Sequence, residues 1–272
     1  MPALTDFAAA RTDKPLAGRV VLVTGAASGL GRHLARAFAL AGADLAVTGR
    51  SATALGETLP ELRGLGAQVL ALVLDVVDRP AVAGAVDRVV ETFGRVDVLV
   101  ANSGVSGPSA PSYEVSDQDW DETIAVNLTG AFACARACAG PMVAARSGVI
   151  LFIGSMTGKR PLLHRAPYAA SKLALVGLCR TMALDLGPYG VRVNVVSPGF
   201  VEGERLDWVV SAQAAAQSRP EQEVGRELAE VSPLGRFTDP VHVARTTVFL
   251  ASDAAAAITG EDLNVSSGVV MF

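Results

Sequence analysis

A glycine-rich turn between a buried strand and an amphipathic helix constrains the fold more than any other feature of this sequence. Residues 19–24 form a short apolar, β-branched run that predicts a buried strand. The turn Gly25-Ala-Ala-Ser-Gly29-Leu-Gly31 follows directly, and apolar residues then recur at helical spacing, at Leu34, Ala35, Phe38 and Ala39. Glycines let a diphosphate approach the backbone, and the start of a helix supplies N–H groups and a favourable dipole. A glycine-rich turn alone can be structural, but between a strand and a helix it predicts a nucleotide site.

Apolar runs and amphipathic segments alternate along the rest of the chain. We expect strands at 19–24, 44–48, 68–74, 96–100, 148–153, 191–196 and 262–265. We expect helices at 29–41, 51–65, 78–93, 117–145 and 239–251, and another that carries Tyr168 and runs to about 186. This alternation predicts an α/β fold with one doubly wound parallel sheet and helices on both faces. The organisation expected is an N-terminal extension over 1–17 and a single domain over 18–272.

Tyr168 follows Ser155 by thirteen residues, and Lys172 lies four residues after Tyr168. On a helix, such residues share one face. An ammonium group beside a phenol favours the phenolate and lowers the tyrosine pKa. Moving that pKa from about 10 to about 7 needs roughly 4 kcal/mol, of which a nearby cation supplies part. The pair predicts a general acid and base, although an isolated Tyr-x-x-x-Lys is usually an ordinary surface pair.

Composition excludes several other classes of protein. The chain has 272 residues, enough for one α/β domain, and half of them are hydrophobic. The net charge is −4 with no basic cluster, which argues against nucleic acid or an anionic membrane as partner. The three cysteines, Cys134, Cys138 and Cys179, have no zinc spacing, so we expect apolar fillers in a reducing compartment and no metal site. No apolar run is expected to reach membrane-spanning length, and residues 1–18 lack a secretory pattern, so a cytoplasmic location is expected.

Further motifs occur in the same order and spacing as in a known family. They are Thr24-Gly25 with Gly29-Leu30-Gly31, Asn102-Ser103-Gly104, Asn127, Ser155, Tyr168 with Lys172, and Pro198-Gly199. Over about residues 17 to 268, the chain resembles the short-chain dehydrogenase/reductase family, in its shorter subtype of about 250 residues. The resemblance implies a Rossmann-like, seven-stranded parallel sheet of order 3-2-1-4-5-6-7 with right-handed crossovers. It also implies an enzyme that moves a hydride between a nicotinamide and a carbonyl or secondary alcohol.

The resemblance implies a role for each of four catalytic residues. Tyr168 exchanges a proton with the reacting oxygen, and Lys172 lowers the Tyr168 pKa and binds the nicotinamide ribose. Ser155 hydrogen-bonds the reacting oxygen and stabilises the charge that develops on it. Asn127 holds a water molecule that links Lys172 to solvent.

The end of the second predicted strand favours NADP(H) over NAD(H). Folds that prefer NAD place an acidic residue there to bind the ribose hydroxyls, and this chain has Gly49. Arg50 follows, and a guanidinium suits the 2′-phosphate of NADP; Ser51 adds a hydroxyl. Many NADP-dependent members carry a second basic residue in the glycine turn, where this chain has Ser28. NAD(H) therefore remains open.

The other cofactor contacts implied by the resemblance follow position by position. Asp75 is similar to an aspartate that reads the adenine amino group, with Val76 beside it. Asn102 and Gly104 match a turn facing the adenine ribose, and Val201 offers backbone groups to the carboxamide. A threonine frequent in the family is absent, because Gly203 takes its place. The full set implied is Gly25, Ala27, Ser28, Gly29, Leu30, Gly31, Arg50, Ser51, Asp75, Val76, Asn102, Gly104, Tyr168, Lys172, Pro198, Gly199 and Val201.

The substrate is less constrained by the sequence. Residues 203–231 interrupt the alternation as a helical insertion, and the resemblance implies a substrate lid there. The substrate-binding residues expected are Ser155, Tyr168, His164 and Trp208, with Glu202, Glu204 and Arg205 on the lid side. The segment 156–167 also contains Lys159, Arg160 and Arg165, which permits an anionic or polyhydroxylated substrate, but most of these charges are expected to be solvated. A sugar or polyol, a β-ketoacyl thioester, a polyketide-type ketone and a hydroxysteroid all remain open.

Two other functions are alternatives to an NADP(H)-dependent oxidoreductase. One is an NAD(H)-dependent dehydrogenase of a sugar, a polyol or a hydroxyacyl compound. The other is a non-catalytic protein that senses NADP(H), against which the presence of all four catalytic residues argues. The partner expected is a small carbonyl or alcohol compound. The resemblance also implies a homotetramer or a homodimer, with the apolar tail 269–272 in its interface.

Overall fold

Seven parallel strands form one sheet in the computed structural model, which describes residues 14–272. The order is β3-β2-β1-β4-β5-β6-β7, as predicted. The strand bounds are β1 Val20–Val23, β2 Asp44–Gly49, β3 Val69–Val73, β4 Val98–Ala101, β5 Gly148–Ile153, β6 Val191–Pro198 and β7 Asp262–Val265. The extension expected over 1–17 lies largely outside the described residues. Its last part packs on the domain, since Leu16 is buried and its N–H donates to the Ala41 carbonyl at 3.0 Å.

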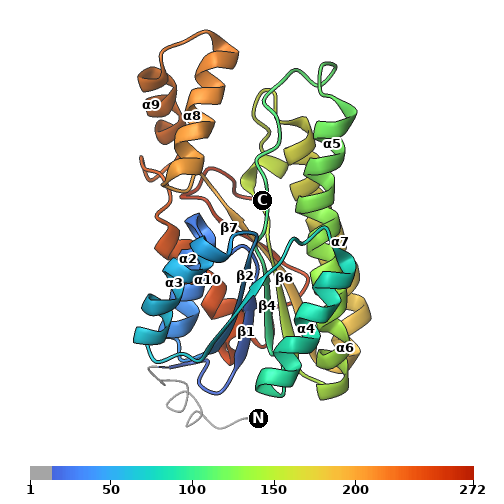
Figure 1. Cartoon of the computed structure of the whole chain (residues 1–272). Coiled ribbons are helices and arrows are strands. Elements are labelled where there is room, and N and C mark those ends of the chain that lie inside the picture. Colours follow the sequence, from blue (N-terminus) through green and yellow to red (C-terminus); the bar gives the residue numbers. More distant parts are fainter. Residues whose placement is uncertain (1–13) are drawn as a thin grey trace.

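Helices cover both faces of this sheet (Figure 1). Helices α2 (Gly29–Leu40), α3 (Ala52–Gly64) and α10 (Pro240–Ala251) pack on one face, and α4 (Arg79–Phe93), α6 (Ala131–Ala145) and α7 (Ala166–Leu186) on the other. Side chains of a strand alternate between faces. In β1, Leu22 therefore joins the core under α4, α6 and α7, while Val21 and Val23 join the core under α2, α3 and α10. Strands buried on both faces explain the continuous apolar runs of the sequence.

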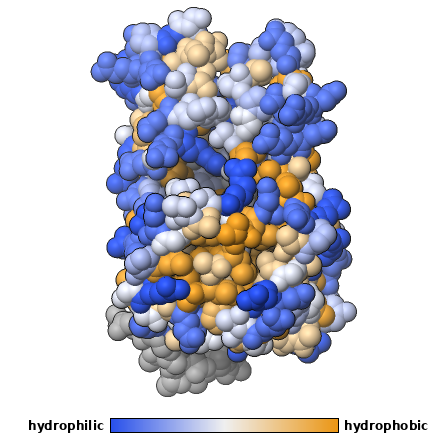
Figure 2. Space-filling view, in the orientation of Figure 1, coloured by the Kyte–Doolittle hydropathy of each residue, from blue (hydrophilic) through white to orange (hydrophobic). Residues whose placement is uncertain are grey.

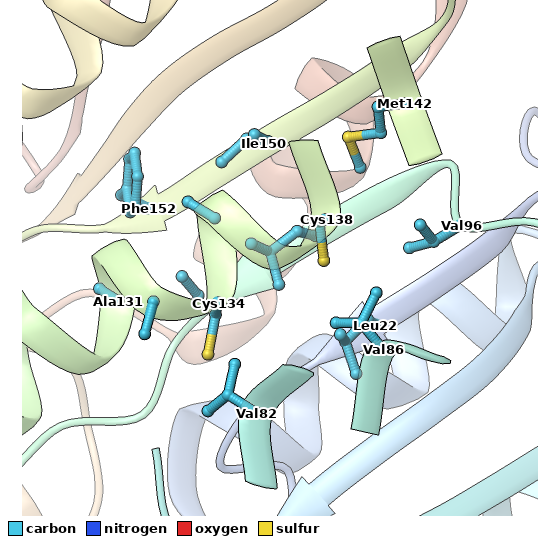
Figure 3. Packing of buried hydrophobic residues seen from close by; sticks show 14 of the residues in the cluster. Leu22, Val82, Val86, Val96, Ala131, Cys134, Cys138, Met142, Ile150 and Phe152 are labelled. Carbon is cyan, nitrogen blue, oxygen red and sulfur yellow. The ribbon is translucent and has the colours of Figure 1, made fainter. Parts of the chain in front are cut away.

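The cysteines lie inside these cores, as predicted. Cys134 and Cys138 project from α6 toward Val82 and Val86 of α4 (Figure 3). All three thiols are free. Burial raises the pKa of Cys134 and of Cys179 to about 12, so these groups are neutral fillers rather than nucleophiles.

The long helix expected over 117–145 is interrupted by a π-helical segment. Helix α5 (Asp117–Ile124) continues into η1 (Ala125–Gly130), which contains Asn127, and then into α6. Such widened turns occur often at functional sites. By length and composition alone, the stretch Asp117–Ala145 is apolar enough for a membrane span, which corrects the expectation that no segment reaches that length. Its α6 part packs on β4 and β5, as a core helix does.

Helices α8 (Glu204–Gln217) and α9 (Glu221–Glu230) extend beyond the carboxyl ends of the strands (Figure 1). They pack over a small separate core that includes Met156, Phe200, Leu206, Val224 and Val270. In the space-filling view, a hollow separates the part formed by α8 and α9 from the part that contains α5 (Figure 2). Short 3₁₀ segments at η2 (Met156–Gly158), η3 (Gly187–Tyr189) and η4 (Asp253–Ala255) complete the described structure.

Candidate active site

The glycine turn forms a narrow backbone cradle between β1 and α2. Gly25 and Gly29 have φ angles of +66° and +50°, which other residues rarely adopt. A Cβ at Gly31 would lie 1.9 Å from the Gly25 carbonyl oxygen, so only glycine lets the helix approach the strand this closely. The Ser28 side chain does not cap α2. The first N–H groups of the helix therefore remain for an anionic ligand, and the turn fits a dinucleotide diphosphate.

Asn102, at the end of β4, connects this turn to the neighbouring strand. Its Nδ2 donates to the Thr24 and Gly25 carbonyls at 2.9 and 3.2 Å. Its own N–H and that of Ser103 donate to the Thr24 hydroxyl, both at 3.0 Å. These bonds fix the glycine turn against the end of β4. The side-chain amide of Asn102 donates both of its hydrogen bonds within the protein.

The end of β2 carries an exposed cation and no carboxylate. A Cβ at Gly49 would lie 3.2 Å from the Ala27 Cβ, which leaves little space for an acidic side chain. Arg50 is exposed directly after it. Ser51 caps α3 by accepting the Ala54 N–H at 3.2 Å, and its hydroxyl proton remains free to donate. These groups fit a phosphate on the adenosine ribose.

The carboxyl ends of β3 and β6 supply the remaining expected cofactor positions. After β3, Asp75 is exposed and accepts the Val77 N–H at 3.1 Å, while Val76 is buried. After β6, a Cβ at Gly199 would lie 2.7 Å from the Ser266 Cα, so glycine is required there.

Val201 pairs with Thr238 in an isolated parallel bridge just beyond Pro198-Gly199. The Thr238 N–H donates to the Phe200 carbonyl at 2.7 Å, and the Glu202 N–H donates to the Thr238 carbonyl at 3.0 Å. In a parallel bridge, the residue between two bonded neighbours directs its own N–H and C=O to the opposite side. The backbone of Val201 is therefore available to an amide ligand.

The structure brings the four predicted catalytic residues together at the carboxyl ends of β4 and β5. Ser155 follows β5 and caps η2 through the Thr157 N–H at 3.1 Å. Tyr168 and Lys172 are buried on one face of α7, with exposed fractions of 8% and 4%. The Lys172 ammonium donates to the Ile153 carbonyl at 2.8 Å and lies 5.8 Å from the centre of the Tyr168 ring.

Asn127 approaches this pair from the π-helical turn. Its Oδ1 accepts the Val105 N–H at 2.8 Å, and its Nδ2 donates to the Val105 carbonyl at 3.0 Å and to the Ser171 hydroxyl at 3.2 Å. Gly104 lies between Asn127 and Lys172, since a Cβ there would be 3.0 Å from Asn127 Oδ1 and 3.6 Å from Lys172 Nζ. The Asn127 side chain therefore positions the loop after β4 beside Lys172.

The surroundings of the Tyr168 phenol make it more acidic. Burial raises its pKa, but the charges of Lys172 and Arg205, the hydrogen bond of the Ser155 hydroxyl and the charge of Arg165, in falling order, together outweigh burial, so the net pKa lies below 10. Burial also lowers the pKa of Lys172, and the Tyr168 phenolate opposes that change. The site therefore favours transfer of the phenolic proton at a lower pH than an ordinary tyrosine does.

A cavity of about 360 Å³ lies between α5 and α8, in the region of the hollow in Figure 2. Of the expected substrate residues, Trp208 lines it. The loop after β4 and helix α5 supply the rest, which sequence reasoning did not identify: Val105, Ser106, Gly107, Pro108, Asp119, Glu122 and Thr123. The loop residues 105–108 include no charged or aromatic side chain, so the sequence did not indicate that they line a cavity.

The expectation that most charges of segment 156–167 are solvated is wrong. Arg165 has an exposed fraction of only 3%. The Lys159 ammonium is also buried, 2.7 Å from the Asp262 carboxylate, and it donates to Asn264 Oδ1 at 2.6 Å. His164 is half-buried with a left-handed φ of +60°, and its carbonyl accepts the Ala110 N–H at 3.2 Å. These groups pack against elements distant in sequence, so their burial could not be predicted locally.

Comparison with known proteins agrees with this geometry. A family model described as Enoyl-(Acyl carrier protein) reductase matches residues 25–270. The chain belongs to the short-chain dehydrogenase/reductase family, as its motifs predicted. It is thus an NAD(P)-dependent oxidoreductase that acts on carbonyl or alcohol groups.

Similar proteins within this family use different substrates. The chain is 38% identical over 256 residues to D-threitol dehydrogenase of Mycolicibacterium smegmatis, covering 94% of both chains. NAD⁺-bound xylitol dehydrogenase is a similar structure, with a TM-score of 0.89 and 33% identity over 93% of this chain and 99% of that one. A variant of actinorhodin polyketide ketoreductase with NADPH also has a TM-score of 0.89, with 35% identity over 93% and 98% of the two chains.

Proposed function

We propose that the protein is an NADP(H)-dependent oxidoreductase that interconverts a ketone and a secondary alcohol, with Tyr168 as general acid and base. The observation that carries this proposal is the buried Tyr168–Lys172 pair on α7, with Ser155 beside it. A non-catalytic sensor of the cofactor would not need a buried phenol surrounded by cations.

Each residue of the site has a defined task in this reaction. The nicotinamide, when bound, supplies the hydride chemistry. Tyr168 donates its phenolic proton to the carbonyl oxygen during reduction, or accepts the hydroxyl proton during oxidation. Ser155 donates a hydrogen bond to the same oxygen and stabilises its developing charge. Lys172 keeps the Tyr168 phenol acidic. It also connects the phenol to solvent through a water molecule held at Asn127, so that Tyr168 can regain or release its proton.

The cofactor preference rests on the end of β2. Arg50 is an exposed guanidinium that binds the 2′-phosphate, and Gly49 replaces the carboxylate that would repel it. The glycine cradle holds the diphosphate, Asp75 and Asn102 lie near the adenosine, and the Val201 backbone binds the carboxamide. The substrate enters through the cavity between α5 and α8, with 203–231 as its lid.

A second candidate is an NAD(H)-dependent polyol dehydrogenase. Asp119 and Glu122 in the cavity suit the hydroxyl groups of a polyol, and Ser28 occupies the place of a second phosphate-binding cation. D-threitol dehydrogenase and xylitol dehydrogenase, both similar to this chain, make polyols natural members of a substrate screen.

The test is a spectrophotometric screen of carbonyls and secondary alcohols with NADPH, NADP⁺, NADH and NAD⁺ in parallel. The panel contains sugars, polyols, β-ketoesters, diketones and steroids, and Tyr168→Phe is the blank. Turnover that depends on Tyr168 and favours NADPH supports the first candidate, and polyol oxidation with NAD⁺ supports the second. Tight cofactor binding without turnover of any compound would mean a narrow substrate outside the panel, or revive the sensor hypothesis.

We also propose a homotetramer or a homodimer in the cytoplasm. Met271 and Phe272 at the end of the apolar tail are 77% and 81% exposed in the single chain, which favours their burial against another copy. Light scattering coupled to size-exclusion chromatography tests the assembly, and removal of the last two residues tests the role of the tail.

A further inference from the structure

A buried arginine beside the catalytic tyrosine has no anionic partner among the residues that the structure describes. The Arg165 guanidinium lies between two rings, 4.7 Å from the centre of Tyr168 and 4.6 Å from that of Trp208. Its single hydrogen bond is a long one, from Nη1 to the Pro108 carbonyl at 3.5 Å. A guanidinium has five N–H donors, and a buried charge normally requires a paired carboxylate.

The two aromatic rings hold this cation in a defined place. Tyr168 belongs to α7 and Trp208 to α8, so Arg165 fills the space between the catalytic helix and the lid. Trp208 and Pro108, both in contact with Arg165, also line the cavity between α5 and α8. The donors that Arg165 does not use within the protein are therefore at the margin of the cavity.

A second arginine approaches from the lid. Arg205, at the start of α8, is exposed and donates to the Gly104 carbonyl at 2.8 Å. Arg205 and Trp208 lie three residues apart on α8 and so share one face, and the Arg165 guanidinium lies over the Trp208 ring. Gly104, which Arg205 contacts, adjoins Lys172, since a Cβ there would lie 3.6 Å from Lys172 Nζ. Burial lowers the pKa of Arg165, the Tyr168 phenolate opposes this change, and the charge of Arg205 lowers the pKa further; no carboxylate is among the described groups that act on it.

We propose that Arg165 and Arg205 form an anion-binding subsite next to the Tyr168 phenol, which takes the carboxylate of a hydroxy-acid or keto-acid substrate. That this anion is a substrate rests on the oxidoreductase function proposed above. An anion between the two guanidinium groups removes their mutual repulsion and supplies the missing hydrogen-bond partners. A neutral ketone or thioester leaves both cations unpaired.

The opposite side of the cavity restricts the substrate further. Asp119 and Glu122 line it from α5, and the Asp119 carboxylate already accepts the Ser116 hydroxyl at 2.6 Å. A second anionic group at that end would meet these carboxylates. The subsite therefore selects a monocarboxylate whose remaining part is neutral or hydroxylated, and it disfavours a dicarboxylate.

Direct binding tests the subsite without turnover. Benzoate and benzamide have the same shape and differ in charge, and calorimetry measures each against the full chain saturated with NADP⁺, in a buffer free of carboxylates. NADP⁺ is present so that any cation that binds its phosphates is already occupied and cannot bind benzoate instead. The variants are Arg165→Met, which keeps much of the volume between the rings, Arg205→Met, which changes an exposed residue, and Arg160→Met as a control in the same loop.

The proposal predicts that benzoate binds at least tenfold more tightly than benzamide to the unchanged protein. Arg205→Met should reduce this preference at least fivefold and Arg165→Met should abolish it, whereas Arg160→Met should leave it unchanged. Equal affinities for the two probes, or a preference that survives both Arg165→Met and Arg205→Met, would overturn the proposal. If Arg165→Met does not fold, the exposed Arg205→Met variant alone decides between these outcomes.

Calorimetry together with the spectrophotometric screen, extended to keto and hydroxy acids, separates this proposal from the proposed function. A preference for benzoate without Tyr168-dependent turnover of any compound leaves the anion subsite in place and argues against the reaction proposed for it. Turnover of neutral ketones together with equal binding of both probes keeps the oxidoreductase and removes the subsite.

Discussion

The Lys172 ammonium lies 5.8 Å from the centre of the Tyr168 ring, one helical turn away on α7. Its bond to the Ile153 carbonyl at 2.8 Å ties it to the end of β5, beside Ser155. The distance between the Tyr168 ring and the Lys172 ammonium is therefore set by the packing of α7 on the sheet.

Replacement Tyr168→Phe should abolish turnover and change the dissociation constant of the cofactor by less than about threefold, since only the hydroxyl is lost. Steady-state kinetics and fluorescence titration with NADPH measure the two effects. Tyr189→Phe, at a half-exposed tyrosine in η3, is the control and should keep full activity. Full activity in Tyr168→Phe would contradict the assignment.

Alcohol oxidation should depend on pH through Tyr168, because only the phenolate accepts the substrate proton. The rate should fall as the pH drops through the Tyr168 pKa, which lies below 10. Arg205→Met removes a cation that favours the phenolate, so the pKa should rise and the fall in rate should begin at a higher pH. Profiles of kcat/KM against pH measure the shift, and Arg160→Met should show none. A shift to lower pH would refute this account of the site.

Arg50→Ala should raise the dissociation constant of NADPH at least tenfold, about 1.4 kcal/mol, with little effect on NADH. The matched control is Arg63→Ala, which removes another exposed arginine near the end of α3. Titrations with both cofactors measure the change. Equal losses for NADPH and NADH would show that Arg50 does not read the 2′-phosphate.

Gly31→Ala should destabilise the protein by about 1–3 kcal/mol and weaken the binding of both cofactors, since the new Cβ would overlap the Gly25 carbonyl. Gly56→Ala, in α3 where a Cβ meets nothing within 4 Å, should be neutral or slightly stabilising. Urea unfolding and cofactor titration measure both effects. Equal stability of the two variants would contradict the tight approach of α2 to β1.

The buried ion pair of Lys159 and Asp262 connects η2 to β7. Lys159→Met leaves the Asp262 carboxylate buried without its cation, so we expect a loss of about 3–5 kcal/mol in the free energy of unfolding. The double change Lys159→Met with Asp262→Leu should recover most of it, because both buried charges are then gone. A double variant less stable than Lys159→Met would show that the pair is not an isolated unit. Urea unfolding of all three proteins decides this.

Much of the fold was predictable because strands buried on both faces give continuous apolar runs, such as Val20–Val23 and Val149–Ile153. The π-helical turn at Ala125–Gly130 was not predictable, since its residues have ordinary helical character. Within this turn, the Asn127 side chain bonds to the backbone of Val105, which lies 22 residues earlier in the chain.

The four catalytic candidates were predictable from short local motifs with distinctive spacing, and the structure brings them together. The sequence predicts mostly solvated charges over 156–167 and does not single out Arg165. Its burial depends on Trp208, which lies more than forty residues further along the chain. A local pattern carries no information about which distant aromatic ring will cover a cation.

The π-helical turn at Ala125–Gly130 also limits how this helix can change in length. One residue advances an α-helix by about 100°, so the extra residue of the wide turn rotates everything after it. Deleting one residue there would keep Asn127 near Val105 but swing Cys134, Cys138 and Met142 away from the sheet. A loop of this protein can lose a residue without this effect. At the π-helical turn, the position of Asn127 and the packing of α6 on the sheet depend on the same rotation of the helix.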